Sequence, residues 1–163
     1  MTALGVFRDD FYNAVSVLPQ SQYNATTQAD ATVLAASVIG GAADCYVSAS
    51  GNTSALGWTT DSAIAIIAQI QQAVATAYKA GLGAFAAGVN PPNGVPNLFN
   101  MSWTLRIANF NSSTGVITLT AGTGVTITGT ATVAVNAERV LVVTVTSPTT
   151  VAIQSVYSGT IAA

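Results

Sequence analysis

The spacing of apolar residues changes near residue 100, and this change constrains the fold more than any other feature of the 163-residue chain. Beyond that point Trp103, Leu105 and Ile107 alternate with other residues, which is typical of a half-buried strand. Runs rich in Val, Ile and Thr follow, separated by short turn sequences, at 116–121, 125–128, 131–135, 139–146 and 149–156. The pattern predicts an antiparallel β-sandwich or barrel-like sheet of about six short strands in residues 101–163.

The preceding part, residues 21–100, has a different pattern. Residues 59–62 (Thr-Thr-Asp-Ser) offer N-capping side chains before an isoleucine-rich stretch of helical period, so we expect one long helix at 62–80. Residues 31–39 and 44–49 predict two short strands with a brief corner between them. A Gly/Pro-rich loop then leads into the β region, and we expect the two parts to pack as one domain.

Residues 1–20 form a separate arm. Phe7, Phe11, Val15 and Leu18 fall on one face of a short helix that Pro19 ends. A helix of this length is marginal alone, so its apolar face must dock on its own domain or on a neighbouring subunit. The whole chain is therefore predicted to be α+β: a helical arm, a small α/β half and a β region.

Composition limits the function. The chain has 4 Lys+Arg, 6 Asp+Glu, no His and one Cys, with a net charge of −2. Histidine catalysis and Cys-cluster metal sites are excluded, so we expect no catalytic residue, no cofactor and no metal. The few basic residues form no stripe for nucleic acid, and no segment is a convincing membrane span. A surface with so few charged residues indicates that part of it is buried against other protein chains.

Several residues are candidates for chemistry. A carboxylate pair for glycoside hydrolysis would come from the six acidic residues Asp9, Asp10, Asp30, Asp44, Asp61 and Glu138, but Asp61 is better suited to capping. Cys45 is disfavoured as a nucleophile because the chain has no histidine to activate it. A serine nucleophile is disfavoured for the same reason, and Lys79 is the base that a Ser–Lys pair would use. The aromatic residues Trp58, Trp103 and Tyr157 offer a sugar-stacking platform, although strand parity favours a core position for Trp103.

Residues 140–145 are apolar on both faces of a predicted strand. Either the strand lies between a second sheet and the long helix, or one face is buried at a subunit interface. The candidate interface residues are those of the arm and of this strand, namely Phe7, Phe11, Val15, Leu18, Val140, Val142 and Val145.

A family resemblance rests on a succession of motifs over residues 30–163. These are the glycines at 40–41 and 51, the helix start at 59–63, and the segments 103–109, 119–129, 139–146 and 151–154. In this succession the chain resembles small structural proteins of tailed-bacteriophage virions, of the capsid decoration (cement) and head-fibre class. The resemblance implies a non-enzymatic homotrimer attached to the outside of the head, with the major capsid protein as its partner.

We therefore expect a capsid-decorating protein on the virion exterior. The charged residues 8–10 come before any apolar stretch that is long enough for a secretory signal peptide. We therefore expect the protein to be made in the host cytoplasm. Two alternatives stay open: a head-fibre or tail-associated protein that binds host glycans, and a polysaccharide hydrolase.

Overall fold

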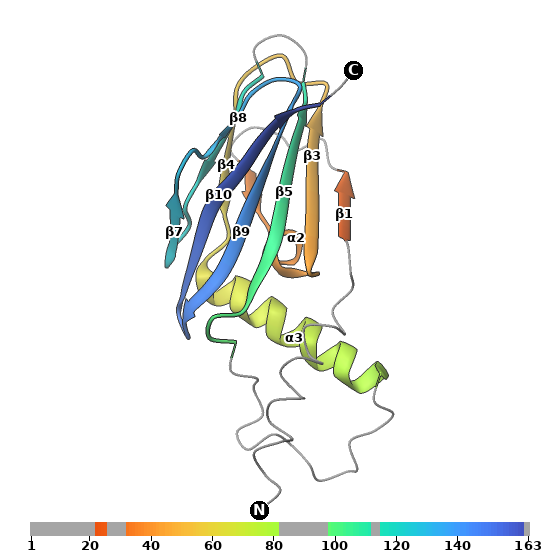
Figure 1. Cartoon of the computed structure of the whole chain (residues 1–163), viewed down its shortest axis with the longest axis vertical. Coiled ribbons are helices and arrows are strands. Elements are labelled where there is room, and N and C mark those ends of the chain that lie inside the picture. Colours follow the sequence, from red (N-terminus) through yellow and green to blue (C-terminus); the bar gives the residue numbers. More distant parts are fainter. Residues whose placement is uncertain (1–21, 26–31, 82–97, 112–114, 162–163) are drawn as a thin grey trace, which may run out of the picture.

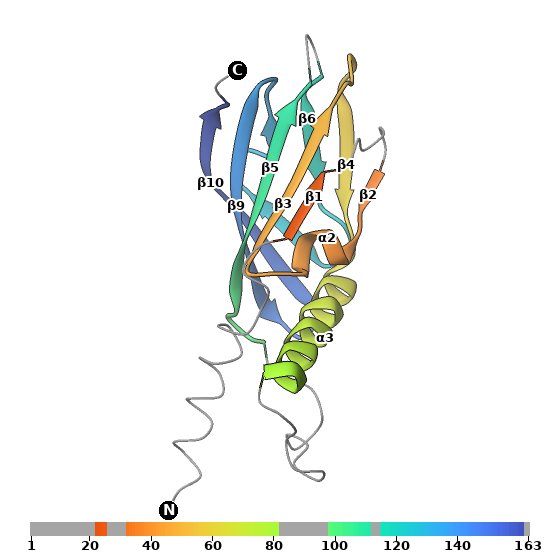
Figure 2. The same cartoon turned by 90° about the vertical axis from the view of Figure 1, so that its right-hand side faces the viewer.

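Two β-sheets face each other across one hydrophobic core, and a long helix lies across one end (Figures 1 and 2). This computed structural model describes residues 22–25, 32–81, 98–111 and 115–161. The expected arm at 1–20, with Phe7, Phe11, Val15 and Leu18, lies outside the described residues, as does most of the Gly/Pro-rich loop.

Six strands form the large sheet and four form the small sheet. In spatial order the large sheet contains β1 (Gln22–Ala25), β3 (Asp44–Ser50), β5 (Ser102–Phe110), β9 (Ala137–Ser147), β10 (Thr150–Thr160) and β7 (Val125–Thr128). The small sheet contains β2 (Thr32–Leu34), β4 (Leu56–Thr60), β6 (Ile117–Thr120) and β8 (Thr132–Val133). The helices are α2 (Ala36–Gly40) and α3 (Ala63–Gly81).

Each sheet combines strands from both halves of the chain, which meet at one boundary. In the large sheet β3 pairs with β5, and in the small sheet β4 pairs with β6. Of the eight strand pairs in the described residues, five are parallel and three antiparallel. The prediction of an antiparallel β region was therefore wrong in part: β7 pairs parallel with β10 inside that region, and β5 and β6 take the parallel partners β3 and β4. The described sheets form an open sandwich and do not close into a barrel.

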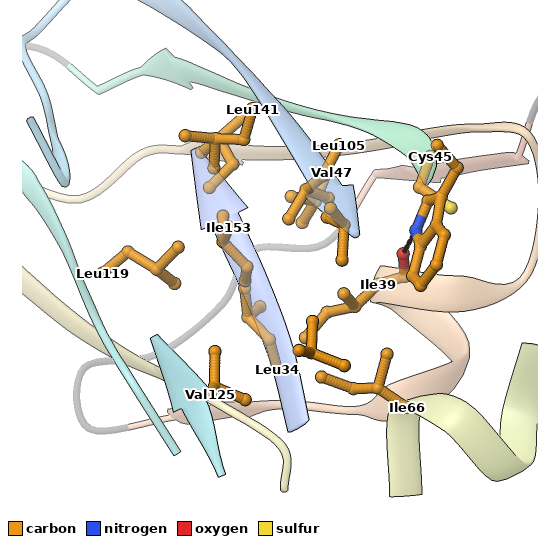
Figure 3. Packing of buried hydrophobic residues seen from close by; sticks show 14 of the residues in the cluster. Leu34, Ile39, Cys45, Val47, Ile66, Leu105, Leu119, Val125, Leu141 and Ile153 are labelled. Carbon is orange, nitrogen blue, oxygen red and sulfur yellow. Dashed lines mark hydrogen bonds between the residues drawn. The ribbon is translucent and has the colours of Figure 1, made fainter. Parts of the chain in front are cut away.

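The core contains side chains from both sheets and both helices (Figure 3). Leu105 and Ile153 project from the large sheet and Leu119 from the small sheet, while Ile39 of α2 and Ile66 of α3 close one end. All five are at least 97% buried. The period-2 pattern of the β region thus arises because one face of each long strand packs into this core.

The predicted long helix is confirmed as α3, which begins at Ala63. The Ser62 hydroxyl accepts a hydrogen bond from the Ala65 amide at 3.3 Å, which is an N-cap contact. About two turns along the helix, α2 packs closely: a Cβ added at Gly40 would lie 3.0 Å from a side-chain carbon of Ile70. Glycine therefore permits the short helix to approach the long one.

Other elements differ from expectation. Residues 31–39 contain the short strand β2 followed by α2, and β2 joins the small sheet while β3 joins the large one, so the two are not a pair. Strand β4 was not predicted, because its five residues run directly into the capping sequence of α3. The predicted strands at 103–108, 116–121, 125–128, 131–135, 139–146 and 149–156 all appear, as β5 to β10, and three of them are long.

Candidate interaction surface

The outer face of the six-stranded large sheet is a regular surface in the described part of the chain. On β9, Leu141 and Val143 are buried in the core, so Val140 and Val142 project to the opposite side, where they are half-buried. Val140 lies beside Arg106 and Val142 beside Thr104 in the β5–β9 ladder. Neither described helix covers this face, since α3 lies across the end of the sandwich (Figures 1 and 2).

This arrangement contradicts the explanation in which the long helix covers the outer face of the doubly apolar strand, while burial of that face at a subunit interface stays a prediction. The inner face of β9 does pack into the core shared with the small sheet. The long helix, however, packs against α2 and an end of β10, so its expected place over the other face was wrong. Val145 was also misplaced among the interface candidates, because its side chain is only 2% exposed and has the same parity as Leu141 and Val143.

A small ionic cluster lies on this outer face. Arg106 Nε is 3.2 Å from Asp44 Oδ1, and one of its terminal nitrogens is 3.7 Å from Glu138 Oε1. The three side chains come from the adjacent strands β3, β5 and β9, and that of Arg106 is 45% exposed. Two carboxylates share one guanidinium, so the cluster carries a net charge of −1 and contributes little stability at such exposure.

The cluster is unsuited to acid–base chemistry. Asp44 and Glu138 were both candidates for a hydrolytic pair, and the fold does bring them to one face. Each carboxylate is held by Arg106, and neither lines the pocket identified among the described residues. Arg106 was not among the predicted site residues, although the alternation of β5 places it on the face opposite Leu105 and Ile107.

The far edge of the large sheet is also apolar. Strand β7 pairs only with residues 151–154 of β10, so the rest of β10 has no described strand beyond it. Two exposed apolar residues, Val156 and Tyr157, lie at a bulge in this free segment, and Tyr157 is 60% exposed. The Tyr157 ring extends along the strand over Gly159, where an added Cβ would be 2.5 Å from its hydroxyl. Residues 156–160 of this edge carry no charged side chain, which suits strand addition, and Arg139 of β9 donates to Ser155 Oγ at 2.9 Å where the free segment begins.

The remaining chemical candidates are dispersed. Asp61 lies between two helix starts, where its carboxylate accepts hydrogen bonds from Ser62 N at 2.7 Å and Ala36 N at 3.2 Å. Cys45 is buried, its Sγ contacts the Ala42 carbonyl at 3.4 Å, and burial raises the pKa of its thiol. Asp9, Asp10 and Asp30 lie outside the described residues, and so does the side chain of Lys79.

The proposed aromatic platform is not formed. Trp103 is buried, as parity predicted, and its indole N–H donates to the Ile39 carbonyl. Trp58 is 0% exposed within the core, where its indole nitrogen has no hydrogen-bond partner among the described residues. Of the three aromatic residues, Tyr157 alone is available at the surface.

No group of three metal-binding side chains occurs in the described part of the chain. The helices described here are too short or too polar to cross a membrane. Comparison of the sequence and structure with protein-family models, curated proteins and solved structures finds no significant match.

Proposed function

We propose that the protein is a non-enzymatic structural component of a tailed-bacteriophage virion. In this proposal it is made in the host cytoplasm, assembles as a homotrimer and binds the major capsid protein on the outside of the head. The observation that carries the proposal is the outer face of the large sheet, which is lined by Val, Thr and Ser and bears one ionic cluster with a net charge of −1.

Such a surface favours contact with protein over recognition of charged or small ligands. Valine and threonine side chains on a sheet present a regular relief that another protein surface can cover, and burial of their apolar atoms contributes about 25 cal/mol per Å². The cluster around Arg106 affects the orientation of a bound protein more than the affinity for it, because each charged group in the cluster already has a partner within the chain. The sequence motifs that resemble decoration proteins support the same role.

Trimerisation and capsid binding require separate surfaces, and the large sheet offers two. Its outer face provides the area for a capsid contact, while its free edge at residues 156–160, which carries no charged side chain, suits pairing between copies. A three-fold ring of this kind would match a local three-fold position on an icosahedral lattice.

The decisive experiment measures binding of purified protein to phage heads that lack it. We expect saturable binding that Val142→Lys weakens at least tenfold, because a lysine would be buried against the capsid. Thr118→Lys is the matched control: Thr118 is exposed on β6 of the small sheet, on the opposite side of the sandwich. Equal binding by both variants, or no binding by the wild type, would contradict the proposal.

Light scattering on the purified chain tests the trimer. We expect a mass of three chains for the wild type and a loss of that species for Val156→Lys, which places a charge on the free edge. A monomeric wild type at high concentration would exclude this assembly.

The glycan-binding alternative has one specific observation in its favour, the exposed ring of Tyr157. A single aromatic residue without neighbouring polar groups in a pocket makes a weak sugar site. Glycan-array binding that is lost in Tyr157→Ala would favour this alternative, whereas turnover of polysaccharide that is lost in Asp44→Ala or Glu138→Ala would favour the hydrolase.

A further inference from the structure

The large sheet has two edges, and each has a segment that is open to strand addition. At one edge β1 pairs only with β3 among the described strands, and at the other β7 covers only residues 151–154 of β10 (Figure 1). We call residues 156–160 of β10 the free segment. Neither β1 nor the free segment contains Lys, Arg, Asp, Glu or Pro, the residue types that commonly block strand addition at sheet edges.

The two open segments lie at the same level of the sheet. The strand register can be followed from one edge to the other: Asn24 lies beside Val47, Val47 beside Ile107, Ile107 beside Arg139, and Arg139 beside Ser158. The neighbouring rows run in the same way, so β1 lies level with residues 155–159. Strand β7 occupies other levels, those of residues 151–154.

The two open segments also point in the same direction. Strands β1, β3 and β5 are parallel to one another. Strand β9 is antiparallel both to β5 and to β10, so β10 has the direction of β5 and therefore of β1.

A closed ring of copies requires both properties. Rotation about an axis along the strands changes neither the direction of a strand nor its height on that axis. One edge can therefore meet the opposite edge of the next copy only if the two run the same way at the same level. A three-fold ring must join two different surfaces in this manner, whereas two identical edges meet about a two-fold axis.

We propose that β1 of one copy adds as a parallel strand to the free segment of β10 in the next copy, so that the partner is a second copy of this chain. The inference rests on the homotrimer of the proposed function and names the two strands that join its subunits. Backbone N–H and C=O groups of both edges gain partners, which supplies affinity without charged side chains. The outer face of the large sheet remains available for the capsid contact.

Cross-linking between chains tests this pairing in the purified full-length protein. In a Cys45→Ala background, Asn24→Cys and Ser158→Cys are made separately and together, and each protein is treated with a short bis-maleimide. We expect covalent dimers and trimers from the double variant and only monomers from each single variant. Within one chain the two positions are four strand spacings, or about 19 Å, apart, so a link between them joins different chains.

The matched control replaces Ser158→Cys with Thr126→Cys. Thr126 is also exposed at this edge, but it lies beside Ala152, about 17 Å along the sheet from the level of Ser158. Combined with Asn24→Cys, it should give at least tenfold less covalent dimer. Equal yields for the two pairs would overturn the proposed pairing.

The remaining outcomes separate this inference from the proposed function. Covalent dimers from Ser158→Cys alone would show that two β10 edges meet, and dimers from Asn24→Cys alone would show that two β1 edges meet; either result would overturn the pairing. A trimer by light scattering without links in the double variant would also overturn it but leave the homotrimer standing. A monomer would exclude both, and binding to phage heads is measured independently of either.

Discussion

At the scale of single residues, Gly122 lies where the turn after β6 meets the end of β4. Its amide donates to Thr60 Oγ1 at 2.8 Å, and a Cβ added there would collide with the Thr60 carbonyl oxygen and lie 2.7 Å from that of Asp61. Both obstacles are backbone atoms, which cannot rotate away. The glycine is therefore required by the approach of two chain segments.

We expect Gly122→Ala to destabilise the fold by about 2–4 kcal/mol, measured by urea denaturation, because the turn must move. Gly51→Ala is the control: Gly51 has open space around it but a φ of +78°, so its variant should lose only about 1 kcal/mol. Equal losses would mean that the close approach has no energetic consequence.

Cys45 gives a pH dependence. Burial raises the pKa of its thiol, so the folded protein keeps this proton where the unfolded chain releases it. Its contribution to stability is complete below about pH 8.5 and falls as pH rises from there toward the raised folded pKa, by at most about 1.4 kcal/mol per pH unit. Denaturation curves from pH 7 to 10 should show this decline relative to Cys45→Ala, and parallel profiles for both proteins would refute it.

At the scale of elements, Asp61 connects α2, β4 and α3. Its two carboxylate oxygens accept from Ala36, the first residue of α2, and from Ser62, the residue before α3, and negative charge at helix starts is also favoured by the helix dipole. We expect Asp61→Ala to lower the free energy of unfolding by about 1–2 kcal/mol. Asp44→Ala removes an exposed ion pair and should change it by less than about 0.5 kcal/mol, so a reversed order would contradict this account.

The strands show where sequence patterns succeed and fail. Alternation placed Trp103, Leu105 and Ile107 correctly in the core, because each strand buries one face. The same alternation places Val145 on the inner face of the strand and Val140 and Val142 on the outer face. The prediction of all three as interface residues did not take this into account. Strand β4 was missed because the Thr-rich sequence at its end also fits a helix cap.

At the scale of the whole molecule, neither half can complete a sheet alone. Strand β3 supplies the partner of β5, and β4 supplies that of β6. We therefore expect separately expressed fragments 1–97 and 98–163 to be unfolded by circular dichroism and to recover a native spectrum when co-expressed. A cooperative unfolding transition for residues 98–163 alone would show that the β region is an independent domain.

The sequence alone determined the long helix, the strands of the β region and their buried faces, because these depend on local period and capping. It also showed that the chain has few acidic and basic residues, and no histidine, for acid–base catalysis or metal binding. Only the tertiary structure decided which strands pair: Asp44 lies opposite Thr104, sixty residues away, and parallel pairing leaves no turn signal in the sequence. The same long-range pairing brought Arg106 between Asp44 and Glu138 and left the outer face of the large sheet without a described helix over it.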